Sequence, residues 1–512
     1  MANPVAAAYD ASPYPEYVFW FTHPDHLAAM GTVFGLSPAP IARARILDLG
    51  CGTGANLLGI AASLPEATCV GIDLSPVQIA HARAHAETAR LTNVTFVLGD
   101  LREFLAADHA PFDYIIAHGL YSWVDPATQQ ALLTGIGQSL APHGVAYVSY
   151  NTYPGWHMAD MVRRLMLLHT AGEEHVDARL EQAVAITRWL HRRTLKNPND
   201  WRDRAIDREL ATIRDNDRSL LLHDLLSTHN NPVYFLDFVR AAEDAGLQYM
   251  ANASPWDMAL ENQDPELVET LTQLGDLLTQ QQYLDFANHA RFRRTLLART
   301  DAPVTREVHA ERVMRFFVTS GMFEDPGLAG IEAGTPVPVR IPNRPVMHVS
   351  APILRLALHL IWQAGRRPLH FDELARDVMT GLRARGLDGS MTDAPDADAR
   401  VRARLAGQLL RAFFADAVKF GVRRPPIARV LPERPTTGRW QRQQAVAGEL
   451  ATNLGHEPFP LSPAQRKVLA ALDGHHDCAA LQGFIDAPIE EVLAGLLQFG
   501  FVLEPDEAAA YT

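Results

Sequence analysis

The chain has 512 residues, of which 47% are hydrophobic and 21% charged, a composition typical of soluble globular proteins with two to four domains. No run approaches 18 apolar residues and no basic region precedes an apolar one at the N-terminus, so we expect neither membrane insertion nor a signal peptide. The formal net charge of −13 argues against a duplex nucleic acid as the main partner. Three cysteines (Cys51, Cys69 and Cys478) lack metal-ligand spacing, so we expect no metal site and a cytoplasmic location.

Residues 1–40 precede the first predicted strand and are rich in aromatic side chains. We expect this N-terminal segment to form a lid across the mouth of a ligand site. The alternative is a hydrophobic arm that packs on the sheet. The side chains concerned are Tyr9, Tyr14, Tyr17, Phe19, Trp20 and Phe21, followed by Thr22, His23 and Pro24.

The segment ILDLGCGTGANLL, residues 46–58, predicts a buried strand, a glycine-rich turn and the start of a helix. Its spacing is Asp48-x-Gly50-x-Gly52-x-Gly54, whereas a dinucleotide site usually has G-x-G-x-x-G, with pyrophosphate on the helix N-terminus. The third glycine comes one residue early and an acidic residue precedes the first. This pattern favours a ligand without phosphate that carries a positive methionine part. The alternative is a purely structural connection.

The following segments repeat the alternation of strand and helix. TCVGIDLSPVQIAHAR places Asp73 at the end of a second strand, where a carboxylate can accept hydrogen bonds from both ribose hydroxyls, and Pro76 at a helix start. NVTFVLGDLREF ends a third strand at Gly99 and Asp100. FDYIIAHGLYSWV and GVAYVSYNTYPGW give a fourth and a fifth strand. The alternation predicts a parallel sheet wound on both faces, with the ligand at the carboxyl ends of its strands.

These motifs resemble motif I and the acidic residues that follow it in the class I S-adenosylmethionine (SAM) methyltransferases. The resemblance implies SAM as the cofactor and Asp100 facing the adenine amino group. The cofactor-binding residues are expected to be Tyr14, His23, Asp48, Gly50, Cys51, Gly52, Gly54, Asn56, Asp73, Leu74, Gln78, Asp100, Leu101 and His118.

Methyl transfer from SAM requires mainly that the acceptor is positioned in line with the methyl group and loses its proton. We expect the residues after the fourth and fifth strands to line the acceptor pocket, namely His118, Tyr121, Trp123, Tyr153 and Trp156. An aromatic pocket suits an amine, and Tyr121 or His118 is positioned to take its proton. The alternative is that these aromatics belong to the core. The motifs of adenine and of cytosine C5 methylases are absent.

The rest of the chain predicts further domains. The proposed division is a Rossmann-like core at 41–160, a helical insertion with late core strands at 161–254, a helical middle domain at 255–345, a helical C-terminal domain at 346–436 and a winged-helix-like domain at 437–512. LQYMANA, residues 247–253, is the candidate sixth strand. Helices are expected to begin at Ser462–Pro463 and at Pro488, and Gly500 to precede a short strand. Because basic residues are few, we expect a structural or protein-contact role rather than DNA binding.

Longer segments resemble a narrower family. YPEYVFWFTHPDHLA, AHGLYSWV, SYNTYPGWHM, HDLLSTHNNPVYFLDFVRAAEDAGLQYMANA and QQYLDFANHARFRRTLLAR are similar to bacterial methyltransferases with a methyltransferase regulatory domain and a C-terminal winged helix. Characterised members are rickettsial protein-lysine methyltransferases that modify an outer-membrane surface protein. The resemblance implies a homodimer. It also places a set of residues beside the active site: His223, Asn230, Asn231, Tyr234 and Phe235.

We therefore predict an α/β protein with a Rossmann-like class I methyltransferase core, a helical insertion and mostly α C-terminal domains that include a winged helix. The leading hypothesis is a cytoplasmic, metal-independent SAM methyltransferase that acts on protein lysine. The substrate is then a protein, with an outer-membrane or surface protein implied by the resemblance. The alternatives are a small-molecule N- or O-methyltransferase and a non-catalytic SAM-binding scaffold.

Overall fold

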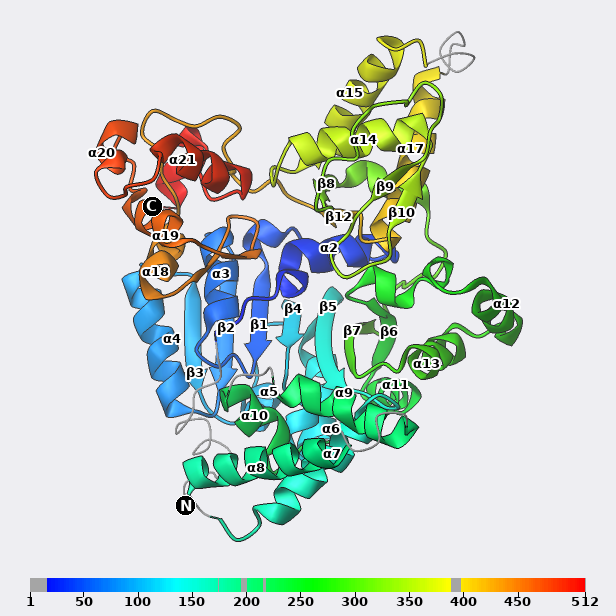
Figure 1. Cartoon of the computed structure of the whole chain (residues 1–512), viewed down its shortest axis with the longest axis vertical. Coiled ribbons are helices and arrows are strands. Elements are labelled where there is room, and N and C mark those ends of the chain that lie inside the picture. The colour runs from blue at the N-terminus through cyan, green and yellow to red at the C-terminus, as the bar shows by residue number, and fades with distance from the viewer. Residues whose placement is uncertain (1–15, 174, 195–199, 215–217, 388–396, 512) are drawn as a thin grey trace.

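The computed structural model describes residues 16–173, 175–194, 200–214, 218–387 and 397–511. Its centre is a seven-stranded sheet of order β3-β2-β1-β4-β5-β7-β6 (Figure 1). The strands are β1 (Arg45–Leu49), β2 (Thr68–Asp73), β3 (Val94–Leu98), β4 (Phe112–Ala117), β5 (Leu140–Asn151), β6 (Leu247–Asn252) and β7 (Phe292–Arg299). Strands β1 to β5 pair in parallel, while β7 is antiparallel to both β5 and β6.

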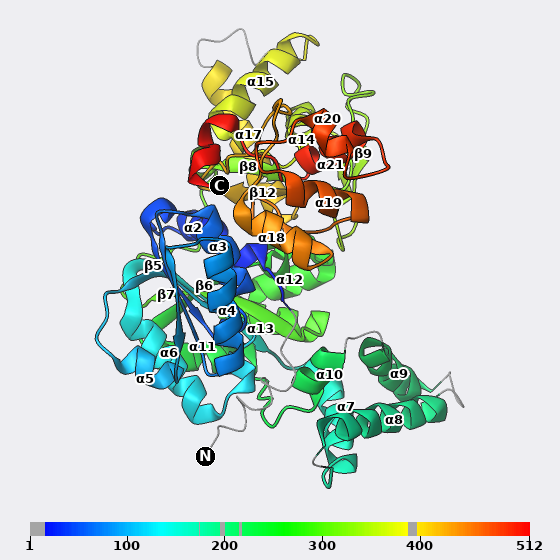
Figure 2. The ribbon, with the colours of Figure 1, turned by 90° about the vertical axis from the view of Figure 1, so that its left-hand side faces the viewer.

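Helices cover both faces of this sheet (Figure 2). One face packs against α2 (Pro24–Val33), α3 (Ala55–Ser63) and α4 (Pro76–Thr88), and the other against α5 (Leu101–Ala106), α6 (Pro126–Ser139) and α11 (Phe235–Asp244). Neighbouring strand residues point to opposite faces, so Ile46 joins the first core and Leu47 the second. Because both faces are buried, the strands are apolar at successive positions. The predicted doubly wound core is confirmed.

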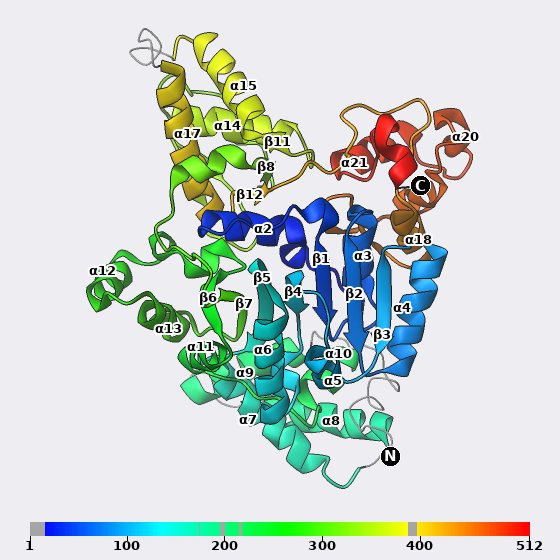
Figure 3. The same ribbon diagram turned by 180° about the vertical axis from the view of Figure 1, so that it is seen from behind.

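A group of helices is inserted between β5 and β6 and is seen from behind in Figure 3. The helices that precede α11 are α7 (Trp156–His169), α8 (Val176–Thr194), α9 (Trp201–Arg214) and α10 (Arg218–Leu225). They bury a separate cluster that includes Val162, Met166 and Leu180. The predicted helical insertion and the predicted sixth strand are thus both present, the strand as β6.

The range 255–345 differs from the helical unit that we expected. It contains α12 (Pro265–Leu274) and α13 (Leu277–Asn288), but also β7, β8 (Phe317–Ser320) and β9 (Val337–Val339), which pairs with β10 (Met347–Val349). Strand β7 completes the core sheet, so the core extends well beyond residue 160.

Two consecutive arginines interrupt the apolar pattern from which β7 would be predicted. Arg293 and its partner Asp285 have side chains only 3% and 5% exposed, with 2.8 Å between Nε and Oδ2. Arg294 pairs with Asp257 at 3.0 Å. The carboxylate that pairs with each arginine comes from outside the strand. The sequence of the strand alone therefore does not show that these charges are paired.

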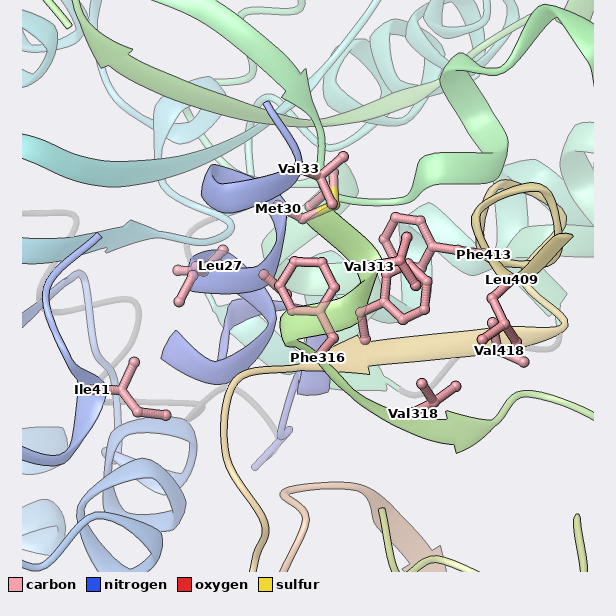
Figure 4. Packing of buried hydrophobic residues seen from close by; sticks show 14 of the residues in the cluster. Leu27, Met30, Val33, Ile41, Val313, Phe316, Val318, Leu409, Phe413 and Val418 are labelled. Carbon is pink, nitrogen blue, oxygen red and sulfur yellow. The ribbon is translucent and has the colours of Figure 1, made fainter. Parts of the chain in front are cut away.

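The next domain contains α14 (Pro352–Gln363), α15 (Phe371–Arg383) and α17 (Ala397–Phe414). A three-stranded antiparallel sheet joins β8 to β11 (Leu369–His370) and β12 (Val418–Gly421). The N-terminal helix α2 packs on this domain as well as on the core sheet, and Figure 4 shows Met30 and Val33 beside Val313 and Phe316. Helix α2 therefore joins one face of the core sheet and this domain in a single hydrophobic cluster.

The C-terminal domain contains α18 (Arg439–Ala447), the hairpin of β13 (Leu450–Thr452) and β14 (Pro458–Pro460), α19 (Pro463–Ala471), α20 (Cys478–Gln482) and α21 (Ile489–Gln498). Helix α19 starts as predicted, with Ser462 and Gln465 forming a capping box. The prediction of a short strand after Gly500 is wrong: the backbone there makes a single isolated β-bridge, between Leu503 and Ile427. Within the described ranges, no helix combines the length and apolar character needed to span a membrane.

The buried pair of Arg293 and Asp285 yields a stability prediction. Asp285→Ala leaves the guanidinium buried without its counter-ion, which costs about 3–5 kcal/mol, so the urea midpoint followed by circular dichroism should fall. Asp301→Ala is the matched control, because the ion pair of Asp301 with Arg299 is exposed and lies at the end of the same strand. Equal shifts for the two variants would contradict the importance of the buried pair.

Candidate active site

A cavity of about 430 Å³ opens at the carboxyl ends of β1, β2 and β3. Its wall combines the turn after β1, the ends of β2 and β3, the loops after β4 and β5, and residues 16–19. These are the positions where the sequence pattern predicts a ligand in a doubly wound sheet.

The turn after β1 supplies the floor of the cavity. Gly52 has φ of +56°, and a Cβ there would lie 2.8 Å from Oε1 of Gln78. Its N–H donates to Oδ2 of Asp73 at 2.9 Å, so the turn is tied to the end of the neighbouring strand. Gly54 (φ +78°) lies behind the wall, where a Cβ would be 2.6 Å from the Phe96 ring. The glycine at position 54 thus permits packing and the start of α3, and is not part of the cavity lining.

Two carboxylates predicted to hold the nucleoside line the cavity. Asp73 accepts N–H bonds from Gly52 and, at 2.9 Å, from Ser75. Asp100 caps α5 and accepts from the Arg102 guanidinium with both oxygens. These bonds hold the pKa of Asp100 below its usual value.

Asp48 is the buried acidic residue of the site. It is only 4% exposed, and burial together with the nearby Asp73 carboxylate raises its pKa to about 7, against the effect of a hydrogen bond from Asn56. A cationic ligand would favour its ionised form. The floor therefore has the electrostatic character expected for the charged methionine part of the cofactor.

The described end of the N-terminal segment contributes to the lining of the cavity. Glu16, Tyr17 and Phe19 line it, and the Phe19 ring lies 3.8 Å from the His118 ring between centroids. Tyr14 lies outside the described residues. His23 does not line the cavity: its Nδ1 accepts from the N–H of Asp25 at 3.0 Å at the start of α2.

Most of the predicted cofactor residues meet in this cavity. Of the described ones, only His23 and Gly54 do not line it. Those that do are Asp48, Gly50, Cys51, Gly52, Asn56, Asp73, Leu74, Gln78, Asp100, Leu101 and His118.

The predicted acceptor residues divide into two groups. His118, Trp123 and Trp156 line the cavity. His118 is hydrogen-bonded through Nδ1 to the Tyr147 hydroxyl at 2.9 Å, and burial lowers its pKa to about 3, so it is neutral.

Tyr121 and Tyr153 do not line the cavity, contrary to our expectation. Tyr121 is 3% exposed and packs edge-on against Phe238 at 5.1 Å, on the far side of the short helix η3 (Tyr121–Trp123). Tyr153 stacks on His157 at 4.3 Å. Tyr121 is therefore an aromatic residue of the core, which was the alternative interpretation of its sequence position.

Lining residues that the prediction missed include Asp224, His229 and Phe292. Phe292 begins the strand that was missed, and Asp224 and His229 come from the insertion. The segment HDLLSTHNN contains both, but no local pattern shows that it returns to the sheet.

The insertion is fastened to the core by two asparagines. Asn230 Oδ1 accepts from Nδ2 of Asn151 at 3.0 Å, and the N–H of Asn231 donates to the carbonyl of Ser122 at 2.8 Å. Of the other residues expected beside the site, none lines the cavity: His223 is buried, Tyr234 is hydrogen-bonded to His157, and Phe235 lies in a separate cluster. Across the described ranges, no group of three or more His, Cys, Asp or Glu side chains is arranged to hold a metal ion.

A glycine turn and acidic residues at the ends of three neighbouring parallel strands, all facing one cavity, define the arrangement of a class I methyltransferase. Family models support this assignment. A methyltransferase domain matches residues 46–144, a predicted methyltransferase regulatory domain matches 217–299, and a PKMT C-terminal winged helix domain matches 433–500.

Relatives match long parts of the chain. An uncharacterized protein of Rickettsia prowazekii is 26% identical over 98% of this chain and 89% of its own length. A second uncharacterized protein of that organism is 34% identical over 46% of this chain and 94% of its own length. The structure of PKMT2 from Rickettsia typhi in complex with AdoHcy superposes with a TM-score of 0.83 at 24% identity, over 96% of this chain and 100% of that chain. The chain belongs to the class I SAM-dependent methyltransferases with a methyltransferase regulatory domain and a PKMT-type C-terminal winged helix.

Asp73 provides a direct test of the cofactor site. Asp73→Ala removes the carboxylate expected to bind the ribose, so the SAM dissociation constant measured by calorimetry should rise by about 100-fold or more. Asp108→Ala changes an exposed carboxylate after α5 and should leave binding unchanged. Unaltered affinity in Asp73→Ala would contradict the ribose assignment.

The raised pKa of Asp48 predicts a pH dependence. Because a cationic ligand favours the carboxylate, SAM binding below the pKa of about 7 should release a proton. Affinity should then rise about tenfold between about pH 5.5 and about pH 7, with a binding heat that depends on the ionisation enthalpy of the buffer. Asp48→Asn should bind more weakly and lose this dependence. A flat profile in the unmodified protein would contradict the prediction.

Proposed function

We propose that this protein transfers the methyl group of SAM to the side-chain nitrogen of protein lysine. One observation carries the proposal: the cavity lining combines three aromatic rings, Trp123, Trp156 and Phe292, with the carboxylate of Asp224. Aromatic faces attract an ammonium group by about 0.5–2 kcal/mol, and a carboxylate adds a charged hydrogen-bond acceptor.

Asp224 has the properties needed to bind a cationic acceptor. It is half-buried and lines the cavity, and burial raises its pKa to about 6, so it is mostly ionised at neutral pH. No ion pair or hydrogen bond joins its carboxylate to another side chain among the described residues. A lysine ammonium would supply the missing counter-charge.

The reaction is an in-line displacement. The lysine must first lose a proton, which costs about 4–5 kcal/mol at neutral pH for an unperturbed pKa, and less in a desolvated aromatic pocket. The nitrogen lone pair then forms the N–CH₃ bond while the S–CH₃ bond breaks, and its electron pair stays on sulfur as a neutral thioether. Burial raises the pKa of Tyr121 to about 12 and the ring packs away from the cavity. The proton therefore leaves by way of Asp224 or His229, directly or through water, because burial lowers the pKa of His118 to about 3 and makes that ring a poor proton acceptor.

The comparisons support the same acceptor. The winged-helix model and the Rickettsia typhi relative both carry the name PKMT, which denotes protein-lysine methyltransferases. The cavity wall also favours a basic acceptor over an acidic one, because Glu16, Asp125 and Asp224 all line it.

The acceptor can be identified with methyl-labelled SAM and a bacterial lysate. We expect label in protein and, after acid hydrolysis, in methylated lysine. The Asp73→Ala variant supplies the background level. Label confined to small molecules would replace the lysine hypothesis with a small-molecule N- or O-methyltransferase, and no label with intact SAM binding would favour a non-catalytic scaffold.

Asp224 yields the matching prediction. Asp224→Asn keeps the shape of the side chain but removes its charge, so kcat/KM for a lysine acceptor should fall about tenfold to 100-fold while the SAM dissociation constant stays constant. Asp244→Asn, an exposed position at the end of α11, is the control. A loss of SAM affinity equal to the loss of activity would show that Asp224 serves the cofactor rather than the acceptor.

A further inference from the structure

A side chain of the winged-helix hairpin, His456, reaches the catalytic core. His456 lies in the turn between β13 and β14 and is fully buried against α3. A Cβ on Gly59 would lie 2.8 Å from both Nδ1 and Cε1 of His456, so the missing side chain of Gly59 makes room for the ring.

The turn that presents His456 is held rigidly. Asn453 Oδ1 accepts from the N–H groups of Gly455 and Glu457, both at 2.9 Å. Asn453 Nδ2 donates to the carbonyl of Phe499 at 2.8 Å. His456 itself has φ of +62°, a left-handed conformation that histidine adopts more readily than most residues. The ring is therefore fixed to the body of the winged helix.

The contact that His456 makes in the core is with Asn56, which lines the SAM cavity. Nε2 of His456 lies 3.1 Å from Oδ1 of Asn56. The backbone N–H of Phe19 points at the same atom at 3.0 Å. Because a backbone N–H can only donate, this atom is the amide oxygen and His456 must donate from Nε2. Burial lowers the pKa of His456 to about 3, so the ring is neutral and carries a single N–H proton, which lies on Nε2.

The Asn56 side chain also forms hydrogen bonds with the N-terminal segment and with the floor of the cavity. Nδ2 donates to Oγ1 of Thr22 at 3.0 Å, and the side chain hydrogen-bonds Asp48. One amide thus connects the buried acidic residue of the cavity, the N-terminal segment that contributes to its lining, and the winged helix. Loss of the His456 donor would leave the amide oxygen with the Phe19 N–H and the longer contact of 3.3 Å to Thr22 Oγ1.

We propose that the winged-helix domain is a structural part of the SAM site, with His456 as the positioning residue that sets the orientation of Asn56. On this proposal the hairpin of the winged helix serves the methyl donor. It does not depend on the identity of the methyl acceptor, because the expected effect is on cofactor affinity.

His456→Phe keeps an aromatic ring but removes the N–H donor. In the full-length protein we expect the SAM dissociation constant and the KM for SAM to rise about tenfold, equivalent to about 1.4 kcal/mol, while kcat at saturating SAM changes less than about twofold. His456→Gln retains an N–H donor at a similar reach and should restore most of the affinity. His475→Phe is the matched control, because His475 is exposed on the same domain.

A second variant tests the contact from the core side. Gly59→Ala should displace the ring and weaken SAM binding, but should have no further effect in a His456→Ala background, where the space is free. The proposal is overturned if His456→Phe binds SAM as tightly as His475→Phe. It is also overturned if His456→Gln is no better than His456→Phe, or if Gly59→Ala and His456→Ala weaken SAM binding additively.

Discussion

Two neighbouring carboxylates, Asp48 and Asp73, impose the main constraint on this structure. They lie at the ends of adjacent parallel strands, where burial and mutual repulsion oppose ionisation of Asp48. The protein compensates with N–H donors from Gly52 and Ser75 on Asp73 and with the Asn56 amide on Asp48. No described lysine or arginine lines this part of the wall; Arg102, which lines the rim, is paired with Asp100. The counter-charge is thus left for the sulfonium cofactor to provide.

The other parts of the chain surround that pair of carboxylates. The N-terminal segment places Phe19 over His118, and the insertion brings Asp224 and His229 to the acceptor side. The winged helix supports the wall from behind through His456. The cavity of this chain is therefore lined or supported by segments that lie outside the contiguous motifs of the core.

The predictable part of the site is the part built from contiguous segments. Asp48, Gly52, Asp73 and Asp100 each follow an apolar strand, and parallel strands bring such positions to one edge, so local pattern and topology sufficed. Phe292 was missed because its strand carries arginines whose partners lie elsewhere in the chain.

Positions within irregular segments were not predictable in the same way. Tyr121 and Trp123 are two residues apart with the same aromatic character, yet the short helix directs one into the core and the other into the cavity. Asp224 depends on how the inserted helices return to the sheet, and three hydrogen bonds made by Asn230 and Asn231 fix that return. Such choices are decided by packing, which a single sequence does not display.

The long sequence separation of these contacts has a consequence for biosynthesis. Helix α2 packs against residues near 316, and the His456 side chain that hydrogen-bonds Asn56 lies 400 residues further along the chain. At about 5–20 residues per second, a ribosome needs roughly 20–80 s to deliver that partner. The glycine turn emerges early and can fold with its own strands, and the described residues that line the cavity all precede residue 293. The hydrogen bond from His456 to Asn56 forms only after residue 456 has been made, so a nascent chain holds the cavity lining before it acquires that support.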